Sequence, residues 1–192
     1  MYTGHIGVAL AARRAATRVP LLLLVVAAQG PDWITVAVGA LGVHDPGELW
    51  SHSLPAIAIG AFVVCACYLW RTKDGRGTWL LCGVYLSHPL LDLVTGRKPP
   101  WPGGTPTGAC LYHTPFRDFV VEAAVLIVGW YVYRKGLPSP TSRRARLAPW
   151  AMLGVLLACQ ALADVTQAYR LSLYPRTRSP CAEYTGIDSD GR

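Results

Sequence analysis

Residues 20–41 read PLLLLVVAAQGPDWITVAVGAL, an apolar run that is interrupted near its middle by Gly30, Pro31 and Asp32. A helix that rises 1.5 Å per residue needs about 20 apolar residues to cross a hydrocarbon core about 30 Å thick, so this run is long enough. The Gly-Pro pair predicts a kink, and a kink within a bundle aims the carboxylate of Asp32 towards neighbouring helices. The run therefore predicts a membrane helix that contains an acid.

Five further segments are apolar enough to be helices of the same bundle, at residues 2–17, 53–70, 78–95, 119–133 and 147–169. Of the 192 residues, 52% are hydrophobic and 15% are charged, which is too apolar for an ordinary soluble domain. We therefore expect an all-α, polytopic membrane helix bundle of about five to six helices. It occupies residues 1–170 and is followed by a polar C-terminal tail at 171–192.

The basic residues fall in short clusters between the apolar runs, so the net charge of +7 indicates membrane topology and argues against nucleic-acid binding. Three lie at 13–18, three at 71–76 and five at 134–146, whereas the alternate connections hold none at 43–51 and three at 96–117. Short basic loops stay in the cytoplasm, so we expect a multi-pass protein with both termini outside. The arginines at 13–18 also interrupt the first apolar stretch, and no cleavable signal peptide is expected.

This topology gathers every histidine and several acids at the outer end of the bundle. They are His5, His44, His52, His88, His113, Asp32, Asp45, Asp92, Asp118 and Glu122. The clearest local signal is SHPLLD at 87–92, because His88 and Asp92 are four residues apart and share one helical face. Such a pair binds one metal ion in some proteins and only orients helices in others, and both interpretations stay open at this point.

Carboxylates at membrane depth need a partner. Each one near the bilayer centre costs about 2.5 to 3.5 kcal/mol on insertion scales, so Asp32, Asp92 and Glu122 together approach ~8 kcal/mol. Arg117 is the only cation close to this end along the chain. A divalent metal or shared protons are the remaining ways to offset the acids, and a mixture of imidazole and carboxylate suits zinc, with iron or manganese as alternatives.

The other polar residues of this end have plainer interpretations. His52 begins a helix that a neighbouring serine could cap, and alone it is equally consistent with an interfacial histidine. We expect Asp118 to cap its helix or to pair with Arg117, whereas Glu122 lies one turn deeper among apolar residues, where solvation does not explain it. His44 and Asp45 are expected to be loop residues.

Five short motifs occur in a fixed order along residues 3–135. They are GH at 4–5, AQGPD at 28–32, SHSL at 51–54, SHPLLD at 87–92 and VVE at 120–122. In order and spacing they resemble bacterial integral-membrane proteins described as metal-dependent hydrolases. That group has been linked to the fold of zinc-dependent phospholipase C and P1-type nuclease, an α-helical bundle whose zinc ions are held by His and Asp. His88 and Asp92 match its His-x-x-x-Asp pair.

The resemblance implies a specific set of metal ligands in a protein of the bacterial cytoplasmic (inner) membrane, and the distribution of basic residues places this site on the outer side. A primary metal would be held by Asp32, His52, His88 and Asp92, with His5 and Glu122 near a second ion, so that one to three divalent ions, Zn²⁺ first among them, are implied. Some members have a second Asp after the Pro-Asp pair and an extra His before the Ser-His-Ser motif. This chain has WI at 33–34 and ELW at 48–50 instead.

The function expected from these features is a membrane-bound hydrolase that uses metal to cleave a phosphoester of a lipid or another membrane-borne substrate. Asp32 would be a ligand or general base, and Arg117 would contact a phosphate. Two other classes of protein are compatible with the same features. One is a non-catalytic scaffold or partner-binding protein with a structural metal or polar cluster, and the other is a small proton-coupled transporter. A cavity that reaches the outer face would favour the enzyme. A closed four-ligand site would favour the scaffold, and a water path to the inner loops would favour the transporter.

Two of the six cysteines, Cys110 and Cys181, lie in segments expected outside the membrane. Disulfides persist outside the cytoplasm and are rare within it. We therefore expect these two residues to pair, with two unpaired surface thiols as the alternative, and we expect the four helix cysteines to be free.

Overall fold

The computed structural model describes residues 3–43 and 48–173, and within them the fold is all-α, as expected. The helices are α1 (Gly4–Arg13), α2 (Leu21–Ala28), α3 (Gly30–Ala40), α4 (Leu49–His52), α5 (Leu54–Thr72), α6 (Gly75–Thr95), the 3₁₀ helix η2 (Leu111–His113), α7 (Pro115–Lys135) and α8 (Arg143–Leu173). The described residues add one isolated antiparallel bridge, between Lys98 and Thr107, and no strand. Residues 44–47, which include His44 and Asp45, lie outside the described part.

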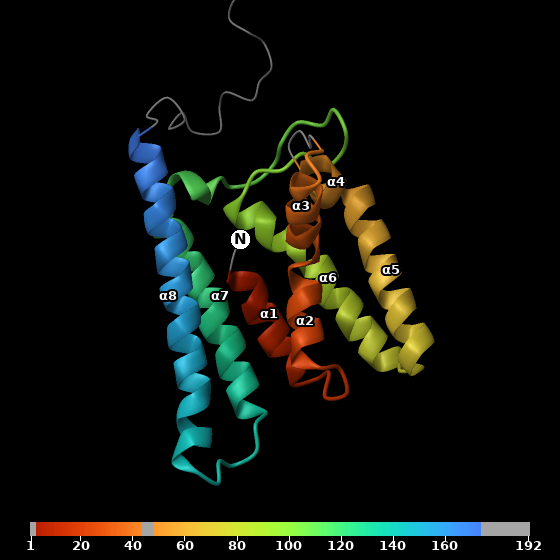
Figure 1. Cartoon of the computed structure of the whole chain (residues 1–192), viewed down its shortest axis with the longest axis vertical. Coiled ribbons are helices and arrows are strands. Elements are labelled where there is room, and N and C mark those ends of the chain that lie inside the picture. The colour runs from red at the N-terminus through yellow and green to blue at the C-terminus, as the bar shows by residue number, and fades with distance from the viewer. Residues whose placement is uncertain (1–2, 44–47, 174–192) are drawn as a thin grey trace, which may run out of the picture.

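Helix α1 is the centre of the bundle although it is only ten residues long. It packs against α7 on one side and against α2 and α6 on the other (Figure 1). α8 packs on α7, and α5 packs on α6, so that each forms an outer wall. The start of α1 therefore lies inside the bundle and not at its edge.

Two glycines allow α1 and α7 to approach each other at backbone distance. A Cβ atom at Gly129 of α7 would collide with the carbonyl oxygen of Gly7, and a Cβ at Gly7 would lie 2.7 Å from the carbonyl oxygen of Val125. Small residues at helix crossings in membranes permit this approach, and the dispersion contacts that follow hold the helices together. This crossing fixes the depth at which α1 enters the bundle.

The expected kink at residues 30–32 is confirmed. α2 and α3 are bent by 64° at the break between them, and Pro31 lies in the first turn of α3. Gly30 is required there, because a Cβ would collide with the ring of Tyr85, a buried residue of α6. The bend places Asp32, in the first turn of α3, beside His88 of α6.

Two helices, α5 and α8, are long and apolar enough to cross a membrane, and the bent pair of α2 and α3 makes a third if it is one broken span. α6 and α7 have 21 residues each, a rise of roughly 30 Å, but both contain buried charged groups. α1 rises only about 15 Å and is too short to cross. Among the described residues, two helices, or three with the bent pair, are therefore candidate membrane spans by length and composition, fewer than the five to six membrane helices expected.

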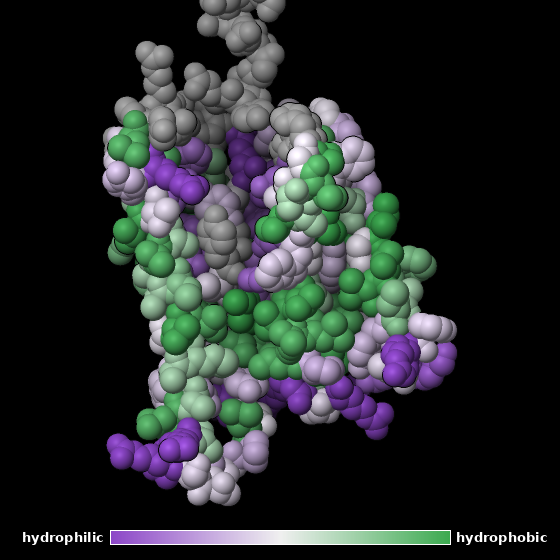
Figure 2. Space-filling view, viewed as in Figure 1, coloured by the Kyte–Doolittle hydropathy of each residue, from purple (hydrophilic) through white to green (hydrophobic). Residues whose placement is uncertain are grey.

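The two ends of the bundle differ in charge. The end of α1, the turn between α5 and α6 and the connection between α7 and α8 lie at the same end (Figure 1), which is where the three basic clusters fall. Figure 2 shows a belt of hydrophobic residues above this end and a recess lined by hydrophilic residues at the opposite end. The assignment of the basic end to the cytoplasm stays a prediction.

The cysteines divide as expected within the described residues. Cys65, Cys67, Cys82 and Cys159 are free thiols in helices, and Cys110 is disulfide-bonded. Cys181 lies outside the described residues, so its pairing with Cys110 stays a prediction.

The crossing of α1 and α7 predicts a large difference between two glycine-to-alanine variants. We expect Gly129→Ala to destabilise the protein by about 1–3 kcal/mol, because the added methyl group overpacks a backbone contact. Gly154→Ala in α8, where a Cβ would meet nothing within 4 Å, is the matched control and should be neutral or stabilising by up to about 1 kcal/mol. Thermal unfolding in detergent measures both, and equal stability of the two variants would contradict the close crossing.

Candidate metal centre

His88 and Asp92 project from the same face of α6, where the surrounding helices bury both of them. The Nδ1 atom of His88 lies 2.8 Å from the carbonyl oxygen of Ala28, at the end of α2. A carbonyl can only accept, so Nδ1 carries the proton, and the lone pair of the neutral ring is on Nε2. That Nε2 lies 3.3 Å from Oδ2 of Asp92.

His52 reaches the same point from α4. Its Nδ1 lies 3.2 Å from Oε2 of Glu48 and 2.7 Å from Oγ of Ser51. Its Nε2 lies 3.1 Å from Nε2 of His88 and 3.3 Å from Oδ2 of Asp92. Because Nδ1 of His52 donates to a carboxylate, the lone pair of the neutral ring is on Nε2 and points into the cluster. Metal-ligating histidines are oriented in the same way by an acceptor behind the ring.

Asp32 closes the cluster on its open side. Its Oδ1 lies 3.3 Å from Nε2 of His52 and 3.7 Å from Nε2 of His88. The Asp32 side chain is 39% exposed, whereas that of Asp92 is 5% exposed. Of the two carboxylates, Asp32 is therefore the one that solvent or a ligand can reach.

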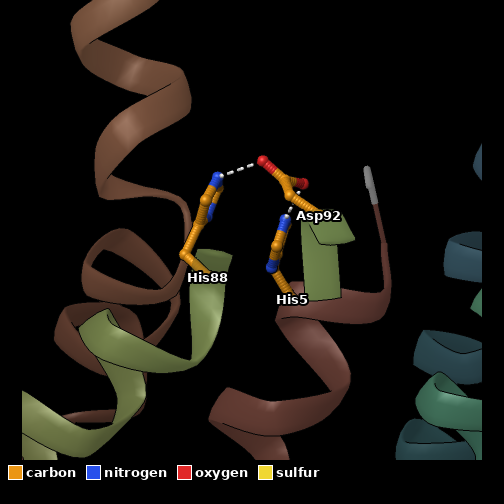
Figure 3. A group of neighbouring side chains, drawn as sticks. All are labelled: His5, His88 and Asp92. Atoms are coloured by element: carbon orange, nitrogen blue, oxygen red, sulfur yellow. Dashed lines mark ion pairs between the residues drawn. The ribbon is translucent and has the colours of Figure 1, made fainter. Parts of the chain in front are cut away.

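His5, which the sequence placed near a second ion, lies within this cluster. Its ring stacks on that of His88 with centroids 3.8 Å apart and planes 7° from parallel, and its Nε2 lies 3.4 Å from Oδ1 of Asp92 (Figure 3). The residue is fully buried, and neither ring nitrogen forms a hydrogen bond of ordinary geometry with the described residues. Asp92 is thus the polar neighbour of Nε2, whereas Nδ1 has no hydrogen-bond partner among the described residues, which is unusual for a buried imidazole.

Together these side chains form two overlapping groups of potential metal donors. They are His5, His88 and Asp92, and Asp32, His52 and His88, and the donor atoms of each group lie within 4.8 Å of one another. Facing lone pairs and two carboxylates repel one another unless a cation or additional protons lie among them. Imidazole nitrogen and carboxylate oxygen are a usual zinc donor set, so the residues fit a divalent ion.

Glu122 holds the start of α1 and is in neither donor group. It is fully buried, and its Oε2 accepts hydrogen bonds from the backbone nitrogens of Thr3 (2.8 Å) and Gly4 (2.9 Å). A carboxylate at a helix N-terminus satisfies amides that lack an intrahelical partner. Glu122 therefore fixes the residues that precede His5, and its expected role near a second ion stays a prediction.

The expectation for Asp118 is wrong. We expected a helix cap or a partner of Arg117, but the Asp118 side chain is buried beside Asp164 of α8. Gln160 joins α8 to this region, because its amide donates to Oδ2 of Asp164 (2.9 Å) and its oxygen accepts from Oγ1 of Thr3 (3.0 Å). Sequence reasoning missed Gln160 and Asp164, whose four-residue spacing in an apolar helix was the available signal.

Glu48 is a second residue that sequence reasoning missed. It has a left-handed backbone (φ 59°, ψ 37°), a conformation that costs a non-glycine residue about 1–2 kcal/mol. Its carboxylate contacts Nδ1 of His52 and forms an ion pair with Lys98. The two contacts offset the backbone strain and hold the His52 ring in place.

A cavity of about 930 Å³ opens beside the cluster, with Asp32 and Glu48 in its wall. Arg97, Lys98 and Tyr112 line the same cavity, so the expectation that Arg117 is the only cation close to this end is wrong. The expected phosphate contact, Arg117, is exposed at the start of α7 and is not among the lining residues, so its role stays a prediction. His113 lies in η2 and belongs to neither donor group.

The fold and this cluster define the class: a helical membrane protein with a histidine and carboxylate site at one end of its bundle. A family model described as YdjM inner membrane protein matches residues 1–171. The chain belongs to this family, and the bacterial inner membrane is its location. No curated protein and no solved structure matches the chain, and the implied relationship to zinc-dependent phospholipase C and P1-type nuclease finds no support in these comparisons.

The donor geometry predicts that metal binding depends on His88 above all, because His88 belongs to both groups. We expect the purified protein to contain a divalent metal and His88→Ala to lose most of it. His113→Ala, which removes an imidazole outside the cluster, should retain it. Elemental analysis of the three proteins measures this, and equal metal content in both variants would mean that the ion is bound elsewhere.

Glu48 should tune this affinity without being a ligand. Loss of a hydrogen-bonding partner behind a metal-bound histidine typically costs about 10–100-fold in metal affinity. We therefore expect Glu48→Gln to weaken zinc binding by about that factor while the fold is retained, as competition with a chelator would measure. An unchanged affinity would show that the contact with His52 is incidental.

Proposed function

We propose that this protein is a membrane-bound hydrolase that uses a divalent metal, Zn²⁺, to cleave a phosphoester of a lipid or another membrane-borne substrate, with its site on the outer side. The observation that supports it most is that the donor cluster is buried except at Asp32, which opens into the cavity. A cavity of about 930 Å³ is within the usual size of ligand sites, roughly 300–1,000 Å³.

The roles of the residues follow from their exposure. His5, His52, His88 and Asp92 are buried donors that would hold the ion in a fixed position. Asp32 contacts both the cluster and the cavity, so its carboxylate can accept a proton from a water molecule that attacks the substrate. A bound divalent ion supplies Lewis-acid activation of water and of the phosphoryl oxygen.

The surroundings of the cluster favour an enzyme over the two other classes. A purely structural metal is enclosed by its ligands, whereas this cluster has an accessible carboxylate beside a large cavity. A transporter needs a polar path to the opposite end. The buried residues one to two turns below His88 on α6 are Tyr85, Val84 and Leu81, which belong to an apolar core.

A phosphoester hydrolysis assay on the purified protein tests this function. We expect zinc-dependent release of phosphate or headgroup that chelation abolishes, and we expect Asp32→Asn to slow it by about 10²-fold or more, the usual contribution of a general base. Asp74→Asn is the matched control, because Asp74 caps α6 at the other end and asparagine caps equally well. Hydrolysis that survives both chelation and Asp32→Asn would refute the proposal.

A further inference from the structure

The cavity beside the cluster has a polar wall and an apolar wall. The polar wall carries the carboxylates of Asp32 and Glu48 and also two cations, Arg97 and Lys98, which we call the cationic wall. Arg97 and Lys98 line the cavity on the segment that follows α6, near Asp32. Trp33 and Val36 of α3 and Leu156 of α8 line its other parts. Figure 2 shows a recess in this upper half that is lined by hydrophilic residues and is bordered by hydrophobic ones. Cationic and apolar walls in one cavity match a ligand with an anionic head and an apolar chain.

We propose that this cavity binds one lipid with a phosphate headgroup, so that Arg97 and Lys98 contact the phosphate and an acyl chain lies between α3 and α8. The inference rests on the proposed function for the reaction that follows binding, and it adds the substrate class, the residues that recognise it and the side from which it enters.

The cationic wall is rigid. Lys98 and Thr107 form two backbone hydrogen bonds (3.1 and 3.0 Å) that clamp the segment after α6, and Nε of Arg97 donates to the carbonyl oxygen of Pro106 (2.7 Å). These bonds hold the guanidinium group in position before any ligand binds. Arginine with a fixed orientation forms paired hydrogen bonds with phosphate oxygens.

The cationic wall is also coupled to the donor cluster. Lys98 forms an ion pair with Glu48, and Glu48 contacts Nδ1 of His52. A phosphate held by Arg97 and Lys98 therefore lies within two side-chain contacts of the cluster, on the side where Asp32 is exposed. In this arrangement the phosphate end of the lipid, and not the acyl chain, faces the donors.

The apolar wall explains why the ligand is a lipid and not a soluble phosphoester. Trp33 is 51% exposed and Val36 is 62% exposed, although both belong to α3, which continues an apolar membrane run. Both side chains line the cavity, so an acyl chain bound there would gain apolar contacts with them that a soluble ester lacks. α3 and α8 stand apart in the bundle (Figure 1), and residues of both line the cavity. In this proposal the acyl chain lies between these two helices and reaches the site from the bilayer.

The test measures binding in the absence of hydrolysis. Metal-depleted full-length protein in dodecyl maltoside, a detergent without phosphate, is titrated with dimyristoyl phosphatidylglycerol, glycerol 3-phosphate and dimyristoylglycerol, with native mass spectrometry as the readout. We expect the anionic lipid to bind at least about tenfold more tightly than either fragment, because each fragment lacks one of the two contacts. Glycerol 3-phosphate that binds as tightly as the lipid would overturn the inference.

Three variants locate the site. Arg97→Ala should weaken lipid binding by about tenfold or more, since it removes charge-assisted hydrogen bonds, and Arg76→Ala at the opposite end should bind like the wild type. Val36→Trp fills the apolar wall without touching Arg97, and it should weaken lipid binding but not glycerol 3-phosphate binding. Lipid binding that is unchanged in both Arg97→Ala and Val36→Trp would overturn the inference.

The two proposals fail separately in these experiments. Lipid binding that depends on Arg97, without hydrolysis after zinc is restored, would refute the enzymatic function and leave the binding site. Zinc-dependent hydrolysis with no dependence on Arg97 or Val36 would refute the lipid site and leave the enzyme.

Discussion

The burial of acids among imidazoles is the constraint on which this structure depends. Asp92 is removed from water in the middle of a bundle, beside Nε2 atoms of three histidines that come from α1, α4 and α6. An uncompensated buried charge costs several kcal/mol, which is comparable to the stability of a whole domain. The bundle therefore needs a compensating cation or protons at this point. Three features bring the side chains of the cluster together: the glycine crossing of α1 and α7, the bend between α2 and α3, and the single turn of α4.

The second layer of contacts explains how the cluster keeps its geometry. The carbonyl oxygen of Ala28 orients His88, the carboxylate of Glu48 orients His52, and Glu122 fixes the chain just before His5. Each of these partners accepts a hydrogen bond from a backbone or ring nitrogen, so the lone pairs of His52 and His88 point inward. A site that is oriented from behind in this way is organised before a ligand arrives, which is the property that binding and catalysis both need.

The long helices and much of the cluster could be predicted from local patterns, and the rest depends on contacts between distant segments. Apolar runs indicated α5 to α8, and the Gly-Pro pair indicated the bend. α7 begins earlier than predicted because Pro115 is tolerated in a first helical turn. The depth of His5 depends on Gly129, far away in sequence, and the role of Glu48 depends on a left-handed backbone and on Lys98. The amide and carboxylate of α8 were overlooked because an apolar helix hides two polar residues in its average hydropathy.

X-ray absorption spectroscopy of the zinc-loaded protein tests the central claim most directly, because it reports the atoms bound to the ion and not only its presence. Coordination by the histidines and carboxylates of the cluster predicts a first shell of nitrogen and oxygen at about 2.0–2.2 Å, with the outer-shell scattering of imidazole rings and no sulfur. A first shell that contains sulfur at about 2.3 Å would assign the ion to the helix cysteines. That result, or a spectrum without imidazole, would contradict the account.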